Sequence, residues 1–398
     1  EKIYFHGNCK TDADLTLGVQ RGIGCFIVDN REELLNLERI AGEAGITQKI
    51  MLRVTPGIDP HTYEAVSTGK VDSKFGAAVE TGQAMELVKL ALAQPHLSLR
   101  GLHCHVGSQV FGEDVYQRTV DIMVPFLAEI RDETGVTLHE LNLGGGYGVR
   151  YTEDDDAIDI PARLAELGAH LKAAAEKAGL PAIRFLMEPG RSIVADAGMT
   201  LYTVGSVKRI PGYKQYVAID GGMTDNPRYA LYQSRYTVLH GSRTGNEERF
   251  DVVGRCCESG DIIQPHVELP VDTCRGDVIA VCTTGAYNYS MASNYNRLPR
   301  PPIVMLAKDR AYEAVRRETL EDLFGLTEVV VFPNVYERCL DAIHEGSVVA
   351  IRGTLNFKEE EAPKILADDV LDLEDAYENG FPQRRSYGNR DGYGGRGQ

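Results

Sequence analysis

The stretch Leu138–Gly146, which reads LHELNLGGG, joins a short apolar run to three consecutive glycines. Such a run, closed by glycine, is typical of a β-strand that ends in a turn. Five more runs of this kind occur in the first two hundred residues: Ile3–His6, Cys25–Asp29, Ile50–Val54, Leu99–Val106 and Ile183–Met187. Amphipathic helical patterns lie between them: Glu32–Ala44, Gly82–Ala93, Val115–Arg131 and Ile160–Ala178. This alternation predicts an α/β fold with a parallel sheet and outer helices. Six strand–helix units fit either a doubly wound sheet or six of the eight units of a (β/α)₈ barrel.

The overall composition of the 398 residues is that of a globular protein, with 43% hydrophobic and 25% charged residues. The formal net charge of −16 argues against non-specific nucleic-acid binding by the chain as a whole. No apolar run approaches the ~18 residues that a spanning helix needs, so no membrane span is expected. The eight cysteines are scattered and lack CxxC spacing, which favours a reducing, cytoplasmic setting.

The texture of the sequence changes twice after residue 199. No long helical pattern begins between residue 199 and Ala311. Short β-like segments occur there instead: Tyr216–Ile219, Phe250–Val253, Val278–Cys282 and Ile303–Leu306. We therefore predict a barrel domain over residues 1–199 and a β-rich domain over 200–323. A third segment, 324–375, contains strands at Glu328–Phe332 and Val348–Gly353 around the helical stretch Asn334–Ile343. The tail, 376–398, is rich in Gly, Arg and Tyr and is expected to be disordered.

Three motifs lie at the ends of predicted barrel strands, where (β/α)₈ enzymes build their sites. Gly144, Gly145 and Gly146 are either a tight turn or a place where backbone N–H groups approach an anion. In Glu188-Pro189-Gly190-Arg191 the charged residues either pair or face a ligand, with Arg191 on a phosphate or carboxylate. Strand alternation puts His103 and His105 on one face, and both could be core histidines. Metal binding there would need ligands that are not placed nearby, so no metal is expected.

Two further motifs lie in the predicted β domain. Cys256 and Cys257 precede Glu258-Ser259-Gly260-Asp261, which is either a polar turn or a thiol set among carboxylates as an acid or nucleophile. The loop Gly285–Met291 carries Tyr287 and Tyr289 and suits a ligand contact, although paired loop tyrosines are common on any surface.

The order of these motifs is more informative than each alone. From Glu1 to about Leu323 the sequence resembles the fold-type III pyridoxal-phosphate decarboxylases. The resemblance rests on seven motifs in this order: HVGSQ, GGG, EPGR, DGGM, RYALY, CESGD and GAYNYSM. Ornithine and arginine decarboxylases share the fold, the glycines and Glu-Pro-Gly-Arg. The wording CESGD and GAYNYSM points to the diaminopimelate branch, which implies decarboxylation of meso-2,6-diaminopimelate to L-lysine. A related basic amino-acid decarboxylase is the alternative within the class.

The resemblance also implies roles for individual residues. Seven residues would hold the phosphate of pyridoxal 5'-phosphate: Ser108, Gly144, Gly145, Gly146, Gly190, Arg191 and Tyr287. Glu188 would face its pyridine nitrogen and His105 would lie against the ring. The substrate would contact Arg191, Arg228, Tyr232, Glu258 and Tyr287. Family dimers share active sites, so Cys257 and Glu258 would serve the neighbouring subunit, where Cys257 returns a proton after carbon dioxide leaves.

One element of the family pattern is not recognised in this sequence. The family anchors its cofactor through a lysine on the first barrel strand, and the resemblance places Ile3–His6 at the third. Lys10 and Lys74 belong to other family motifs, so neither takes that role. We expect an N-terminally truncated enzyme that has little or no activity as this chain alone.

The sequence beyond Leu323 resembles a different family. Three stretches resemble the OB-fold module of bacterial replicative DNA polymerase alpha subunits: Glu328–Glu337, Val348–Gly353 and Ala362–Val370. The string Thr319–Leu323 fits both families, so we expect a chimera joined there, by recombination or by misassembly of the sequence, or else a genuine fusion. An incomplete OB-like segment would bring weak binding of single-stranded nucleic acid through residues 324–398, although Glu359–Glu361 and Asp368–Glu378 would repel phosphate.

Overall fold

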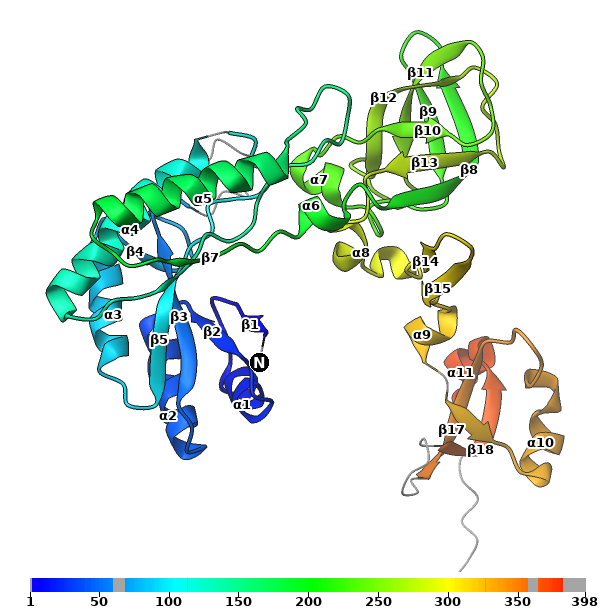
Figure 1. Cartoon of the computed structure of the whole chain (residues 1–398). Coiled ribbons are helices and arrows are strands. Elements are labelled where there is room, and N and C mark those ends of the chain that lie inside the picture. The colour runs from blue at the N-terminus through cyan, green and yellow to red at the C-terminus, as the bar shows by residue number, and fades with distance from the viewer. Residues whose placement is uncertain (1, 60–68, 113, 326, 357–363, 382–398) are drawn as a thin grey trace, which may run out of the picture. The chain divides into compact units, whose positions relative to one another are not determined.

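The computed structural model describes residues 2–59, 69–112, 114–325, 327–356 and 364–381 (Figure 1). The chain separates into two compact units, Glu1–Arg300 and Pro301–Gln398. The predicted division between residues 323 and 324 therefore differs from the structural one, which follows Arg300. In the described part of the chain, no helix is both long and apolar enough to cross a membrane.

The first unit begins with a curled parallel sheet whose helices lie outside it (Figure 1). The strands in spatial order are β1 (Tyr4–Phe5), β2 (Cys25–Val28), β3 (Gln48–Thr55), β5 (Leu97–His103), β6 (Glu140–Asn142) and β7 (Arg184–Leu186), and β4 (Ala77–Ala78) pairs with β3. The helices are α1 (Asp12–Gln20), α2 (Arg31–Glu43), α3 (Gln83–Leu92), α4 (Val115–Thr134) and α5 (Ile160–Lys177). The predicted α/β fold is confirmed at the level of a half-barrel sheet, and all six predicted strands are present.

The apolar pattern did not predict strand β4 or helix α1. Helix α1 begins with a capping box, in which Thr11 and Asp14 each accept a hydrogen bond from the other's backbone N–H. Its interior contains Gly18, which lowers helix propensity. A Cβ at Gly18 would lie 2.5 Å from Cζ of Phe26, so packing against the buried β2 requires this glycine.

The parallel register determines where the site forms. Leu102 and Leu141 are partners in adjacent strands, and both are fully buried. One residue further along, His103 is the partner of Asn142, and Asn142 is in turn the partner of Leu186. Because all these strands run in one direction, the residues after their carboxyl ends gather at one edge of the sheet.

A six-stranded β region completes the first unit. Its strands are β8 (Met199–Ile210), β9 (Lys214–Ile219), β10 (Val238–His240), β11 (Glu247–Val253), β12 (Ile262–Pro270) and β13 (Val278–Cys282), in the spatial order β10-β13-β8-β9-β11-β12. Three short helices accompany it: α6 (Arg191–Val194) before β8, α7 (Arg228–Tyr232) between β9 and β10, and α8 (Asn288–Met291) after β13. The predicted β-rich texture after residue 199 is confirmed, and α6 and α7 each begin at an arginine of the candidate site.

The second unit begins with a hairpin of β14 (Ile303–Leu306) and β15 (Ala311–Val315), followed by α9 (Leu320–Phe324). A helical pattern from Ala311 was expected, and that expectation is wrong. The alternating sequence Ala-Tyr-Glu-Ala-Val pairs antiparallel with β14 instead, with Tyr312 opposite Met305.

A three-stranded sheet follows within the described residues. It contains β16 (Glu328–Val330), β17 (Val349–Asn356) and β18 (Lys364–Asp372), with helices α10 (Pro333–Cys339) and α11 (Leu373–Asn379). Helix α11 begins at the N-cap Asp372 and extends beyond residue 376, so the expectation of a disordered tail from 376 is wrong for its first residues. Residues 382–398 lie outside the described part. Three strands are fewer than the five of an OB-fold, and that resemblance stays a prediction.

Candidate functional site

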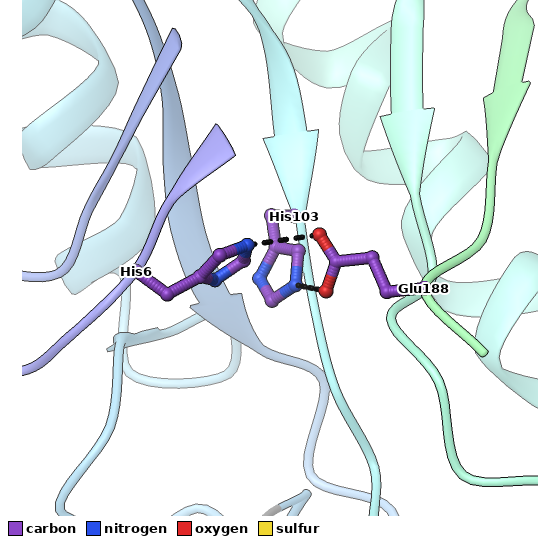
Figure 2. Close-up of side chains that lie close together, drawn as sticks. All are labelled: His6, His103 and Glu188. Carbon is purple, nitrogen blue, oxygen red and sulfur yellow. Dashed lines mark hydrogen bonds and ion pairs between the residues drawn. The ribbon is translucent and has the colours of Figure 1, made fainter. Parts of the chain in front are cut away.

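The carboxylate of Glu188 lies at the centre of a polar cluster at the carboxyl edge of the sheet (Figure 2). His6 follows β1, and its Nε2 is 2.9 Å from Oε1 of Glu188. His103, the last residue of β5, places Nε2 3.3 Å from Oε2. Asn142, the last residue of β6, donates from Nδ2 to Oε1 at 2.7 Å. Side chains from three strand ends therefore converge on the residue that follows β7.

The protonation states in this cluster follow from its burial and its hydrogen bonds. Burial alone would raise the pKa of Glu188, but hydrogen bonds from His103 and His6 outweigh it and hold this pKa well below its usual range. Burial lowers the pKa of His103 to about 4, so its imidazole is neutral at pH 7. A neutral His103 that donates from Nε2 leaves Nδ1 as an acceptor, and this buried atom has no hydrogen-bond partner among the described residues.

The same three side chains are the set in this region that could hold a metal ion. One ligand atom from each of His6, His103 and Glu188 lies within 4.8 Å of the others (Figure 2). Two imidazoles and one carboxylate are a donor set that zinc accepts. In the structure these atoms are hydrogen-bonded to one another, and the expectation that no metal takes part stays a prediction.

The glycine run forms a turn with no room for side chains. Gly144 has φ +70°, and a Cβ at Gly145 would lie 2.2 Å from the carbonyl oxygen of Glu188. A Cβ at Gly146 would lie 2.2 Å from the carbonyl oxygen of Gly107. The turn therefore packs backbone against backbone between the β5 and β7 connections. The turn therefore requires glycine for its packing, and its predicted role in binding an anion stays a prediction.

Arg191 lies beside this turn and is almost fully buried. It donates from Nη2 to Oγ of Ser108 at 2.8 Å and from Nη1 to the hydroxyl of Tyr151 at 2.5 Å. Its buried Nε has no partner among the described residues. The structure thus joins two predicted phosphate ligands, Ser108 and Arg191. Gly190 is the N-cap residue of α6, directly before Arg191.

Tyr287 lies between two guanidinium groups. The Cζ atom of Arg191 is 4.6 Å from the centre of its ring, and that of Arg228 is 5.5 Å away. Arg228 also lies 5.2 Å from the ring centre of Tyr232. The Nε of Arg228 is buried without a partner in the described structure. Four predicted site residues from separate motifs therefore form one contiguous group: Arg191, Arg228, Tyr232 and Tyr287.

His105 follows β5, next to the glycine turn. A Cβ at Gly144 would lie 2.7 Å from Nδ1 of His105, so the imidazole packs directly on the turn. Burial lowers the pKa of His105 to about 4, which leaves the ring neutral at pH 7. A neutral, planar side chain in this position suits contact with a flat ligand.

Cys257 and Glu258 lie on an exposed loop of the β region. The backbone N–H of Cys257 donates to Oδ1 of Asn296 at 3.2 Å, and Glu258 accepts a hydrogen bond from the hydroxyl of Tyr295. The thiol and this carboxylate are both exposed. Such exposure is what the predicted service to a neighbouring subunit requires, and that role stays a prediction.

The two lysines considered as cofactor anchors have other contacts. Lys10 is buried, and its Nζ donates to the carbonyls of Gly7 and Ile27 and to Glu33 at 2.7 Å. These three bonds use all the donors of its ammonium group. Lys74 lies over the ring of Phe75, 5.0 Å from its centre. Both observations agree with assigning neither lysine the anchoring role.

Sequence reasoning missed His6, Asn142 and Tyr151. Asn142 could have been noticed as an amide between two leucines, two residues before the first glycine. Tyr151 had no such signal, because only the fold brings its hydroxyl to Arg191.

These features together fit a phosphorylated, flat, basic ligand such as pyridoxal 5'-phosphate. The glycine turn, Ser108 and Arg191 offer anion donors, and the ionised Glu188 offers an acceptor to a protonated ring nitrogen. The unpartnered guanidinium nitrogens of Arg191 and Arg228 are donors that a ligand can use.

Comparison with known proteins gives the same answer. The family described as "Pyridoxal-dependent decarboxylase, pyridoxal binding domain" matches residues 1–195. The diaminopimelate decarboxylase of Bacillus subtilis (strain 168) is 43% identical over 328 residues, which cover 82% of this chain and 74% of the relative. That of Mycobacterium tuberculosis (strain ATCC 25618 / H37Rv) is 40% identical over 336 residues, covering 82% and 75%.

Solved structures agree with the sequence comparison. The diaminopimelate decarboxylase from M. jannaschii, in complex with L-lysine, matches with a TM-score of 0.76 and 34% identity, covering 82% of this chain and 74% of that one. The Helicobacter pylori enzyme, also complexed with L-lysine, matches with a TM-score of 0.72 and 31% identity, covering 81% and 78%. Together with the relatives, these findings show that the chain belongs to the diaminopimelate decarboxylase family of pyridoxal-phosphate-dependent carboxy-lyases.

Proposed function

We propose that this protein catalyses the decarboxylation of meso-2,6-diaminopimelate to L-lysine with pyridoxal 5'-phosphate. The observation that carries the proposal is the 43% identity to the Bacillus subtilis enzyme over 82% of the chain. The contiguous group around Glu188, the glycine turn and Arg191 supports it, because these are the residues to which the resemblance gives cofactor roles.

Each cofactor contact has a physical role. When bound, pyridoxal phosphate supplies an electron sink for the electron pair that remains on the substrate α-carbon after carbon dioxide departs. Glu188 stays ionised and holds a proton on the ring nitrogen, which maintains that electron demand. The glycine turn, Ser108, Arg191 and Tyr287 bind the phosphate dianion. His105, neutral because it is buried, packs against the ring face.

The proposed substrate contacts would favour a substrate with two amino-acid ends. Arg228 and Tyr232 lie beside Tyr287, where a guanidinium can pair with the distal carboxylate. We propose a homodimer in which the partner subunit's Glu258 pairs with the distal ammonium group. The partner subunit's Cys257 then returns a proton to the α-carbon. The exposure of both residues in one chain supports this arrangement.

A reducing, cytoplasmic setting is part of the proposal. All eight cysteines are free, and Cys257 must remain a thiol to deliver its proton.

The alternative, a decarboxylase of ornithine type, has weaker support. The lysine/ornithine decarboxylase from Vibrio vulnificus, complexed with cadaverine, matches with a TM-score of 0.61 at 24% identity, which shows the fold alone. Ornithine lacks the second carboxylate that Arg228 would bind, so substrate choice separates the two functions.

The test is lysine formation from meso-2,6-diaminopimelate in two proteins. One is the 398-residue chain. The other, called the joined protein below, has the first two strand–helix units of the Bacillus subtilis relative placed before Glu1, where the resemblance implies the anchoring lysine. We expect lysine from the joined protein, little from the chain alone, and at least about 100-fold lower kcat/KM for ornithine. Equal use of ornithine would favour the alternative, and no product from either substrate would contradict the proposal.

A further inference from the structure

The amide of Asn142 connects the two ends of the proposed cofactor site. Its Nδ2 donates to Oε1 of Glu188 at 2.7 Å, and its Oδ1 accepts the backbone N–H of Gly144 at 2.9 Å. One end of the amide therefore touches the carboxylate assigned to the ring nitrogen. The other end touches the first glycine of the turn assigned to the phosphate.

The orientation of this amide is determined by its neighbours. If the amide were flipped, its carbonyl oxygen would face the carboxylate of Glu188 and its NH₂ would face the N–H of Gly144. Both contacts would be repulsive, since acceptors would meet acceptors and donors would meet donors. Asn142 is also 1% exposed, so water cannot substitute for either partner.

The backbone closes a ring around the same residues. The N–H of Glu188 donates to the carbonyl of Gly144 at 2.8 Å, and the N–H of Leu143 donates to the carbonyl of Leu186 at 3.1 Å. The carbonyl of Asn142 accepts from Cys104 at 2.9 Å, which attaches the ring to the β5 end. A shift of the glycine turn therefore moves the carboxylate, and the reverse also holds.

The hydrogen bond from Asn142 occupies one of the acceptor sites of the Glu188 carboxylate. Oε1 is shared by His6 and Asn142, and Oε2 is occupied by His103. A carboxylate has about four acceptor sites, so three contacts leave one for a ligand donor. Asn142 thus helps select which lone pair faces the ring nitrogen.

We infer that Asn142 is a positioning residue that sets the Glu188 carboxylate against the pyridine nitrogen and couples it to the phosphate-binding glycine turn. This inference rests on the proposed function, because it takes the roles of Glu188 and of the turn from there. It predicts that a substitution of Asn142 can remove the contact with Glu188 while it keeps the contact with the N–H of Gly144.

The test uses pyridoxamine 5'-phosphate, which binds without a covalent bond, and inorganic phosphate as a probe of the turn alone. In Asn142→Ser, a short hydroxyl can still accept from the N–H of Gly144 but does not reach Glu188. In Asn142→Asp the acceptor remains, the donor is lost, and a second carboxylate faces Glu188. Asn30→Asp is the control, because Asn30 caps α2 and its acceptor oxygen is kept by aspartate.

We expect both Asn142 variants to bind pyridoxamine 5'-phosphate about tenfold more weakly or worse, as the loss of a hydrogen bond to a charged group requires. Inorganic phosphate should bind within about twofold of the unsubstituted protein. In Asn142→Asp the two carboxyl groups share a site, so the pH at which the ring-nitrogen absorbance of the bound ligand changes should shift by about one unit or more. The Asn30→Asp protein should behave as the unsubstituted one.

Several results would overturn the inference. If both variants fold, as thermal unfolding would show, and bind the ligand normally with an unchanged pH profile, Asn142 positions nothing. An equal loss of both ligands would show that the residue only supports the turn. If Asn142→Asp fails to fold, Asn142→Ser decides alone. Failure of the unsubstituted protein to bind pyridoxamine 5'-phosphate would contradict the proposed function and overturn the inference with it.

Discussion

At the scale of single residues, the site depends on one carboxylate kept ionised in a partly buried setting. His6, His103 and Asn142 supply hydrogen bonds to Glu188 that compensate its loss of water. Because these donors come from different strand ends, the charge of Glu188 is a property of the folded sheet and not of the local sequence.

Replacing Glu188 by Gln should lower the kcat for lysine formation by about 100-fold or more, since a neutral amide does not keep the ring nitrogen protonated. The measurement is steady-state turnover of meso-2,6-diaminopimelate by the joined protein. The control is Glu166→Gln, which changes an exposed carboxylate on α5. Unchanged turnover in Glu188→Gln would contradict the assignment.

The low pKa of His103 has a consequence for stability. Its pKa is about 4 in the folded protein and about 6.5 in an unfolded chain, so between these values the unfolded state binds more protons. Stability must therefore fall as pH decreases from about 6.5 towards 4. In His103→Asn this contribution is absent, and the free energy of unfolding measured in urea should depend less on pH over that window. A steeper dependence in the variant would contradict the buried neutral state.

How far the site was predictable differs from residue to residue. Ser108, Arg191 and Tyr287 were named from motifs, and the structure brings them together. His6 and Asn142 were not named. Asn142 carried only the weak signal of an amide between two leucines, and nothing local marks His6 as a partner of Glu188, 182 positions away. The position of Cys257 relative to a second subunit belongs to an assembly, so it stays a prediction.

At the scale of elements, the glycine turn after β6 is tightly constrained by packing. Its backbone lies against the connection after β7, where the carbonyl of Glu188 would be 2.2 Å from a Cβ at Gly145. The strands and the glycine turn together determine where the carboxyl edge of the sheet lies, and the side chains at that edge form the site.

Substitution of Gly145 by Ala should destabilise the protein by about 2–3 kcal/mol, because backbone must move to admit the methyl group. The matched control is Gly168→Ala in α5, where an added Cβ meets no atom within 4 Å. That change should stabilise the helix by up to about 1 kcal/mol. Urea unfolding of both variants checks the contrast, and similar effects of the two substitutions would refute the packing argument.

The elements were predictable where an apolar period was strong. Six of the seven strands of the parallel sheet were identified because buried parallel strands tend to be apolar runs, and the two-residue β4 was missed. The sequence of strand β15 does not distinguish strand from helix, since a five-residue segment with two alanines carries little information on period. Helix α1 was missed because Gly18 and polar residues obscure its buried face, which only contact with Phe26 reveals.

At the scale of the whole molecule, the candidate site belongs to one of the two units. Every residue to which we assign a cofactor or substrate role lies within Glu1–Arg300. The OB-like interpretation of residues 324–375 and the weak nucleic-acid binding by residues 324–398 stay predictions, and they concern residues that the site does not use.

Deletion of Pro301–Gln398 should therefore leave the affinity for pyridoxamine 5'-phosphate within about twofold of the intact chain. Isothermal titration of both proteins makes the comparison. A loss of about tenfold or more would show that the second unit contributes to the site. The same pair of proteins, titrated with a short single-stranded DNA at low salt, tests whether the second unit binds nucleic acid.

The central claim is that the site recognises both the phosphate and the ring of its cofactor. The decisive measurement is calorimetric titration of the 398-residue chain with pyridoxamine 5'-phosphate and, separately, with pyridoxamine, neither of which needs a covalent anchor. We predict that the phosphorylated compound binds at least about 100-fold more tightly, because Arg191, Ser108 and the glycine turn recognise its phosphate. Equal affinities for the two compounds, or no binding of the phosphorylated one, would contradict the central claim.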